Sequence, residues 1–284
     1  MKAAHYITFA SSITLTALLY WGGNTIPPAK KKGSENKPSG AMAQGPNTVK
    51  PASSDSMITA SIMLLPKTAA DSVKAMESEL AATSDSSRMA VVFLRMAAVL
   101  QRNRQVPVAN YFNAKAAKLE NSGKKLTFAG QIFLELMQQE HNPSVQLWEA
   151  GQAAYCLERS LEIDSVNEDT KLALATAYIE GTGEPMKGVM ILRGITTQKP
   201  DDIPANMLLG RMSIQSGQFD KAVKRFETVL RQEPGNSEAV YFMAQACEGL
   251  GDKKKAIGYL EKCKVLVNKA EFSKEIDQHI NTLK

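Results

Sequence analysis

The sequence is poor in the residues that most catalytic and metal sites need. Its 284 residues include three cysteines and three histidines. The cysteines (Cys156, Cys247 and Cys263) lie too far apart for a disulfide scaffold, and none forms a C-x-x-C pair. We expect them to be small buried hydrophobic residues within helices. The histidines are scattered at positions 5, 141 and 279, so the sequence predicts no metal site.

Motifs of common enzymes and nucleotide-binding proteins are also missing. Gly181-Thr182-Gly183 lacks the further glycine or the Lys-Ser/Thr pair that a phosphate-binding loop needs. No G-x-S-x-G and no H-E-x-x-H occurs. Glu158 and Glu162 have helical i,i+4 spacing, but an exposed helix face explains both. We therefore predict a protein that is not an enzyme and has no cofactor.

Charged residues are missing from one long stretch near the start of the sequence. Residues 3–29 contain no Lys, Arg, Asp or Glu. This length is sufficient for one membrane-spanning helix, which needs about 20 residues. We expect residues 1–26 to be a membrane anchor or uncleaved signal segment that contacts the membrane through residues 6–26. A cleaved signal peptide is the alternative, although Ala41-Met42-Ala43, the best cleavage site, lies far downstream.

Two rules disagree about the side of the membrane on which the rest of the chain lies. A short head with one lysine, Lys2, before an apolar core is typical of an exported chain. The lysines that follow the core, beginning with Lys30, would keep the chain in the cytoplasm by the positive-inside rule. We favour a membrane-anchored protein of bacterial type with its C-terminal domain in the periplasm. The cytoplasmic face of the membrane is the alternative.

The next segment, residues 27–58, is expected to be a disordered linker. Its first part, residues 27–55, has no Ile, Leu, Phe, Tyr or Trp, so it cannot bury enough apolar surface to offset the entropy of ordering. It has five lysines and two acidic residues, and with Lys2 it accounts for most of the net charge of +5. The remaining sequence is nearly neutral, so we expect no nucleic-acid partner.

The C-terminal half of the sequence repeats with a period of 34 residues. Three copies follow one another without a gap, at 169–202, 203–236 and 237–270. Each has two apolar stripes at helical spacing, separated by a glycine. In the middle copy, Gly210 and Ala222 are the small residues of the two helices, Gly217 lies at the turn, and Pro234 ends the second helix. Each copy therefore predicts a helical hairpin that must stack on the next one to cover its apolar face.

This pattern resembles the tetratricopeptide repeat (TPR) family in its period and in its small and large positions. The resemblance implies an all-α, TPR-type α-solenoid of helical hairpins with a C-terminal capping helix. From the N-terminal segments described above, we expect a single transmembrane helix and the flexible linker to precede it. One departure concerns the fourth position of each copy, where the family has a large aromatic residue. Those positions are Leu172, Asn206 and Val240.

The resemblance extends upstream in a weaker form. TPR-like repeats are expected over residues 90–270, with two further copies at 90–123 and 123–167. The second of these has an insertion around residues 140–144, which we expect to form longer helices and a longer loop. Extra N-terminal helices are expected over 59–89. Residues 271–284 are expected to form the capping helix, because their apolar residues lie on one face.

In the TPR family the first helix of each hairpin lines a concave groove that binds peptides. Carried over to this sequence, the resemblance implies a partner-binding groove lined by Thr170, Ala173, Ala177, Glu180, Met207, Arg211, Ile214, Gln215, Glu238, Tyr241, Gln245 and Glu248. We expect apolar residues such as Met207 and Tyr241 to be exposed there.

These features lead to one main hypothesis and two alternatives. The main hypothesis is a membrane-tethered, non-catalytic scaffold that binds another protein or a peptide segment in the groove and assists the assembly of a complex. The first alternative is a structural homo-oligomer of the cell envelope. The second, less favoured, is an enzyme whose site the sequence does not reveal.

Overall fold

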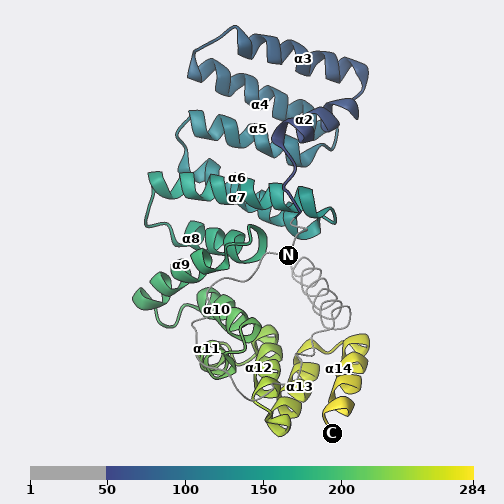
Figure 1. The fold of residues 1–284 in the computed structure, drawn as a ribbon, viewed down its shortest axis with the longest axis vertical. Helices are drawn as coiled ribbons and strands as arrows, with labels where there is room; N and C mark the ends of the chain where they lie inside the picture. The colour runs from purple at the N-terminus through teal and green to yellow at the C-terminus, as the bar shows by residue number, and fades with distance from the viewer. Residues whose placement is uncertain (1–48) are drawn as a thin grey trace, which may run out of the picture. The chain divides into compact units, whose positions relative to one another are not determined.

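The computed structural model describes residues 49–284, which form one unit. The anchor expected over residues 1–26 and the linker up to residue 48 lie outside the described residues. Between residues 49 and 284 all regular elements are helices, which confirms the all-α fold (Figure 1). None of the helices in this range combines the length and the apolar character needed to cross a bilayer.

The helices follow one another as antiparallel hairpins. The first two are α2 (Ser54–Met63) and α3 (Lys67–Ala81). The hairpins are α4 (Ser86–Arg102) with α5 (Val106–Leu119), α6 (Gly123–Gln139) with α7 (Pro143–Ile163), α8 (Glu168–Thr176) and η1 (Ala177–Gly181) with α9 (Pro185–Gln198), α10 (Ile203–Gln215) with α11 (Phe219–Gln232), and α12 (Ser237–Gly249) with α13 (Lys253–Val267). The last helix is α14 (Ala270–Leu283).

The turns inside the last three hairpins share one feature, a glycine with a positive φ angle. Gly183, Gly217 and Gly251, each 34 residues from the next, have φ angles of 74°, 70° and 78°. Residues other than glycine rarely adopt this left-handed conformation, so glycine is strongly favoured at each of these turns, although Arg104 adopts it, at 59°, in the turn between α4 and α5. The next hairpins also begin alike, because Asp202 and Asn236 accept hydrogen bonds from the backbone N–H groups of the first turns of α10 and α12.

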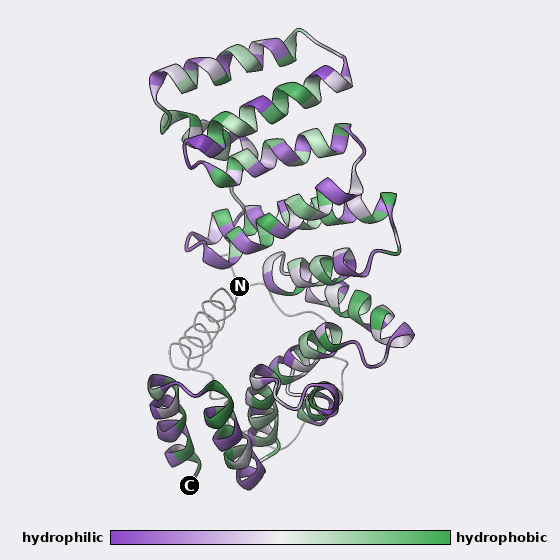
Figure 2. Cartoon of the chain, turned by 180° about the vertical axis from the view of Figure 1, so that it is seen from behind, coloured by the Kyte–Doolittle hydropathy of each residue, from purple (hydrophilic) through white to green (hydrophobic). Residues whose placement is uncertain are grey.

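Small residues bring the two helices of a hairpin close together. At Gly210 of α10, an added Cβ would lie 2.5 Å from Cζ of Phe226, a fully buried residue of α11. Ala222, also fully buried, is the corresponding small residue of α11. Apolar side chains such as Phe226 and Met243 then form the core between hairpins. Figure 2 shows hydrophobic and hydrophilic residues alternating along the helices, as expected for such a stack.

The contacts between hairpins give the stack an inner and an outer layer. From α6 onward, the first helices of neighbouring hairpins contact each other: α6 with α8, α8 with α10, and α10 with α12. The second helices, α7, α9, α11 and α13, have almost no contact with one another. The first helices pack closer to one another than the second helices do, so the stack of hairpins curves. The first helices lie on the inner side of this curve. We call this side the inner face.

The start of the described chain differs from the sequence-based expectation. Helix α2 begins at Ser54, inside the segment expected to be a linker, because Ser53 caps it by accepting a hydrogen bond from the N–H of Ser56. This segment is also attached to the repeats. The N–H of Ala52 donates to the carbonyl of Ser144 at 2.8 Å, and Nε1 of Trp148 donates to Oγ of Ser54 at 3.0 Å.

The insertion in the second hairpin also takes an unexpected form. Helices α6 and α7 are long, as expected, but only residues 140–142 separate them, so the longer loop does not form. Glu140 stabilises this tight connection by accepting hydrogen bonds from the N–H groups of His141 and Asn142. The π-helix η1 at the end of α8 was not expected either. There Gly181 packs so closely that an added Cβ would lie 2.4 Å from Cβ of Ala150.

Candidate functional site

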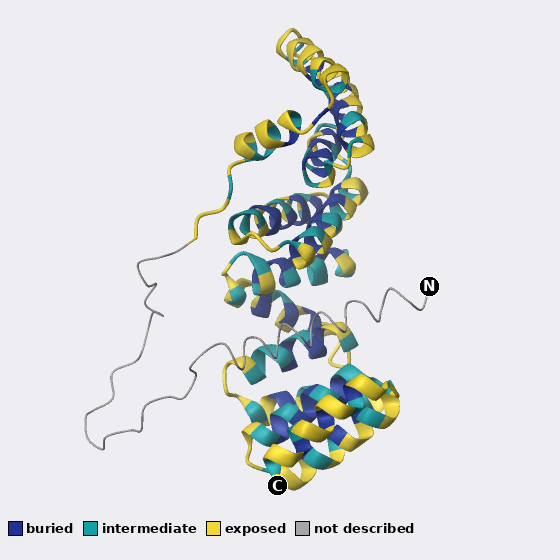
Figure 3. Ribbon diagram, turned by 90° about the vertical axis from the view of Figure 1, so that its right-hand side faces the viewer, coloured by how far each residue is buried: buried dark blue, intermediate teal, exposed yellow. Residues whose placement is uncertain are grey.

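Helices α8, η1, α10 and α12 of the inner face carry all twelve residues of the expected groove. Three of them are buried: Thr170 and Ala177 have no exposed surface, and Met207 is 9% exposed. Met207 lies in the core between α10 and α12, so the expectation that it is exposed was wrong. Its burial follows from the close packing of first helices, which covers one side of each helix. Figure 3 shows this mixture of buried and exposed residues along the stack.

The polar contacts of Thr170 explain why it is buried. Its hydroxyl shares a hydrogen bond of 2.8 Å with Thr127 of α6, and Thr127 shares another of 2.8 Å with Ser160 of α7. Ser160 in turn donates to the carbonyl of Gly123. This chain of hydroxyl groups joins three helices and satisfies polar atoms that burial would otherwise leave unpaired. Thr170 is therefore a packing residue between neighbouring first helices.

Arg211 joins three successive hairpins across the inner face. Its Nη2 lies 3.0 Å from Oε1 of Glu180 on η1, and its guanidinium lies over the ring of Phe242 on α12, 5.7 Å from the centroid. Its positive charge also acts on Glu238 of α12. The side chains of Arg211 and Glu180 are 32% and 21% exposed, so a partner can still reach them. One cation therefore lies between two carboxylates on a partly exposed surface.

Glu238 has an altered proton affinity in this arrangement. Burial raises the pKa of its carboxyl above the usual range, and the nearby Glu180 raises it further. Arg211 acts in the opposite direction and lowers this pKa. An additional cation from a partner would favour the charged form of Glu238 in the same way.

The remaining groove residues extend this surface towards the C-terminus. Tyr241 is partly buried against the core, and its hydroxyl is hydrogen-bonded to Gln245. Glu248 lies 2.8 Å from Nε2 of His279 on the capping helix α14. That hydrogen bond raises the pKa of His279, although partial burial acts against it. Ala173 and Ile214 are partly buried, and Gln215 is exposed at the end of α10.

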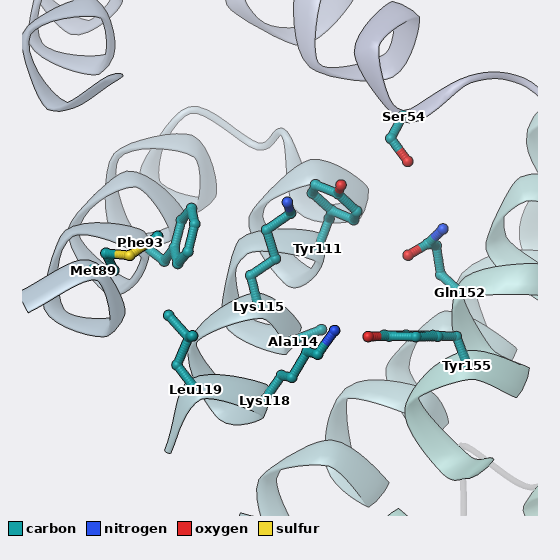
Figure 4. Close-up of a pocket in the computed structure, with 10 residues that line it drawn as sticks. All are labelled: Ser54, Met89, Phe93, Tyr111, Ala114, Lys115, Lys118, Leu119, Gln152 and Tyr155. Atoms are coloured by element: carbon teal, nitrogen blue, oxygen red, sulfur yellow. The ribbon is translucent and has the colours of Figure 1, made fainter. Parts of the chain in front are cut away.

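The structure also contains a pocket that sequence reasoning missed. A cavity of about 440 Å³ lies among α2, α4, α5 and α7 (Figure 4). Nζ of Lys115 lies over the rings of Phe93 and Tyr111 at 5.6 and 5.1 Å, and Nζ of Lys118 lies over Tyr155 at 5.3 Å. The residues come from helices that are far apart in sequence, and Ser54 belongs to the segment expected to be a linker. Only the spacing of Tyr111, Lys115 and Lys118 at helical intervals was visible beforehand.

The cysteines are buried and free, as the sequence indicated. Burial raises the pKa of the thiols of Cys156 and Cys263, the latter to about 11. A thiol with a raised pKa is a poor source of the thiolate that nucleophilic catalysis needs. Within residues 49–284 there is no cluster of three or more His, Cys, Asp or Glu residues with the arrangement of a metal site.

Comparisons with known proteins give one family match and similar solved structures. Residues 213–262 match the model of a tetratricopeptide repeat family. The crystal structure of MamA is similar with a TM-score of 0.50 at 18% identity, over 64% of this chain and 93% of that one. YrrB, described as a TPR protein with an unusual peptide-binding site, has a TM-score of 0.48 at 18% identity, over 72% and 99%. No curated protein matches the chain significantly in sequence.

Proposed function

We propose that this chain is a tetratricopeptide repeat protein and acts as a non-catalytic scaffold that binds a segment of another protein on its inner face. The contact of Arg211 with Glu180 and Phe242, which links three hairpins on a partly exposed surface, is the observation that supports it most directly. Accessible charged and aromatic groups that are held in place by neighbouring helices can bind an extended segment with little further loss of entropy.

The charges of the inner face define the partner segment that fits it. Among the expected groove residues, Glu180, Glu238 and Glu248 are acidic and Arg211 alone is basic. Because Glu238 is partly buried, its negative charge costs free energy unless a cation is nearby. The partner segment therefore carries Lys or Arg next to an apolar residue that contacts Ile214 or Tyr241. Its binding weakens as the salt concentration rises.

Site-specific photocrosslinking in cells tests this proposal. A photoreactive amino acid replaces Gln215, which is exposed on the inner face, or Arg231, which is exposed on α11 of the outer layer. We expect a crosslinked partner from position 215 and none of the same mass from position 231. The variant Arg211→Gln should abolish the product at 215 while the protein still unfolds in one transition, at a somewhat lower melting temperature, because the variant loses a partly exposed ion pair and the contact with Phe242.

The mass of the crosslinked product separates the proposal from its alternative. A product of twice the mass of this chain would favour a homo-oligomer instead of a scaffold. A product that persists in Arg211→Gln, or that forms equally at position 231, would contradict the assignment of the inner face. Assembly of a complex is tested next, by asking whether the captured partner loses its own associations in cells that contain the Arg211→Gln variant.

Tethering to a membrane is a further part of the proposal, supported by the uncharged stretch at residues 3–29 alone. In this arrangement residues 1–26 anchor the chain and the repeats lie on the periplasmic side. A phosphatase that is active only in the periplasm, fused after Thr48, should be active. Inactivity of this fusion, with activity of a matched cytoplasmic reporter, would place the repeats on the other side.

A further inference from the structure

A second cavity, on the outer layer of the stack, has a different composition from the inner face. It measures about 380 Å³ and lies between α9 and α11, with α10 beneath it. Second helices of neighbouring hairpins have almost no contact with each other, which leaves space here. We call it the outer basic pocket and define it by Arg193, Asn206, Lys221, Lys224 and Arg225.

Four cations line the outer basic pocket, and no carboxylate does. Arg225 donates from Nη1 to Oδ1 of Asn206 at 2.9 Å, and Lys221 donates to the side-chain carbonyl of Gln218 at 2.6 Å. None of these four cations forms an ion pair with any residue in the described range 49–284. Arg193, Lys221 and Lys224 are exposed, whereas Arg225 is partly buried, and a partly buried cation is commonly paired with an anion.

Burial and a like charge both act on Arg225. Burial lowers the pKa of its guanidinium, and the nearby Arg193 lowers it further. Both effects reflect a cost of holding positive charge at this place, and an anion in the pocket would remove that cost. The pocket wall also contains apolar side chains from α9 and α10, such as Val189, Leu209 and Met212.

Comparison with the two neighbouring copies shows that the polar pair formed by Asn206 and Arg225 is particular to the middle hairpin. Asn206 is the fourth residue of its copy and is 1% exposed. Arg225 faces it from the second helix. The residues at the same two positions are Leu172 and Ile191 in the preceding copy and Val240 and Tyr259 in the following one. The flanking hairpins thus have hydrophobic pairs where this one has an amide that orients an arginine.

A hydrophobic pair would serve the stability of the stack better than a buried amide and a partly buried guanidinium. The asparagine does, however, hold the guanidinium in one orientation beside Arg193. The planar guanidinium groups of two neighbouring arginines, one of them held by Asn206, match the oxygen atoms of phosphates and of clustered carboxylates. Lys221 and Lys224 add two mobile cations at the edge of the same cavity.

We propose that the outer basic pocket is a binding site for a multivalent oxyanion, in which Arg193 and Arg225 contact the oxygen atoms directly and the two lysines supply additional positive charge. The chemical class is a pyrophosphate-like group or a cluster of carboxylates. This site is independent of the inner face, which is mainly acidic.

Isothermal titration calorimetry of the full chain at low salt tests this inference. The two probes are inorganic pyrophosphate and a synthetic peptide of four consecutive glutamates. We expect one molar equivalent of at least one probe to bind. Pyrophosphate alone would identify a phosphate ligand, the peptide alone an acidic protein segment, and both would support the shared oxyanion chemistry.

Variants identify the pocket as the place of binding. Arg193→Gln combined with Arg225→Gln should weaken binding about tenfold or more, since the loss of one hydrogen bond to a charged group lowers affinity by about that factor. Lys221→Gln combined with Lys224→Gln changes only exposed residues and should also weaken binding, so the test survives if the arginine variant does not fold. The matched control is Lys253→Gln with Lys254→Gln on α13, exposed residues outside the pocket. Binding of neither probe, or equal weakening by the control, would overturn the proposal.

Discussion

Glu149 is a buried carboxylic acid in the middle of α7, and its ionisation should make the stability of this protein depend on pH. The residue is 1% exposed, and its Oε2 has no hydrogen-bond partner among the described residues. Burial, together with the negative charge of Glu140, raises the pKa of Glu149 from 4.5 to about 7. The folded protein therefore binds a proton more tightly at this position than the unfolded chain does.

The sign and size of the effect follow from this difference in pKa. Between pH 4.5 and 7 the folded state holds more protons than the unfolded state, so the free energy of unfolding falls as the pH rises. Each pKa unit corresponds to 1.36 kcal/mol, so the total loss from this group is about 3 kcal/mol and is complete by about pH 8. That is a large fraction of the 5–15 kcal/mol stability of a typical protein.

The substitution Glu149→Gln removes the ionisable group and keeps its shape. The buried amide has its own constant cost, so the quantity to measure is the change with pH. Urea unfolding followed by circular dichroism at pH 4.5, 6 and 8 gives the free energy of unfolding of both proteins. We expect the stability of the variant relative to the wild type to increase by about 3 kcal/mol from pH 4.5 to pH 8.

Glu135→Gln, which changes an exposed glutamate on α6, is the matched control and should leave the pH dependence of the wild type unaltered. If the curves of Glu149→Gln and the wild type run parallel from pH 4.5 to pH 8, Glu149 does not hold its proton in the folded state. The reasoning from burial would then be refuted.

Two further predictions concern helix packing and the capping helix. Gly210→Ala should lower the free energy of unfolding by about 1–2 kcal/mol, because the clash with Phe226 outweighs the gain in helix propensity. Gly258→Ala, where an added Cβ meets nothing within 4 Å, should instead raise it by about 0.5–1 kcal/mol in the same urea titration. The pKa of His279, raised by Glu248, implies that their contact stabilises α14 at low pH and is lost as the pH rises through that pKa. His279→Gln should remove this dependence, measured by hydrogen exchange of α14 amides, and unchanged protection across pH would contradict it.

Local rules were sufficient for the repeat architecture. Gly217 and Gly251 adopt positive φ angles because the chain must turn there, and this requirement is visible in one sequence as a glycine every 34 residues. Position 210 needs a small residue because Phe226 of α11 packs against α10 there. The place of Gly210 within the 34-residue repeat indicates this need in the sequence too. The burial of the cysteines could also be predicted, because their positions on apolar helix faces are local properties.

The candidate sites depended on contacts between hairpins, which no single helix shows. Helical spacing places Met207 on the first helix of its hairpin, but only the packing of α12 against α10 decides that it is buried. The sequence contains Arg211 and Glu180 31 positions apart, and stacking of the hairpins brings them to 3.0 Å.

The sequence by itself determined that this chain forms stacked helical hairpins, since period, turn glycines and apolar stripes are properties of segments. Only the tertiary structure decided which side chains remain accessible and which charges share a surface. In the folded chain Met207 is buried and Arg211 stays accessible to a partner. The four cations of the outer basic pocket come together between α9 and α11. The physical reason is that burial and charge pairing are set by the neighbouring hairpin, whose distance and orientation a local pattern does not contain.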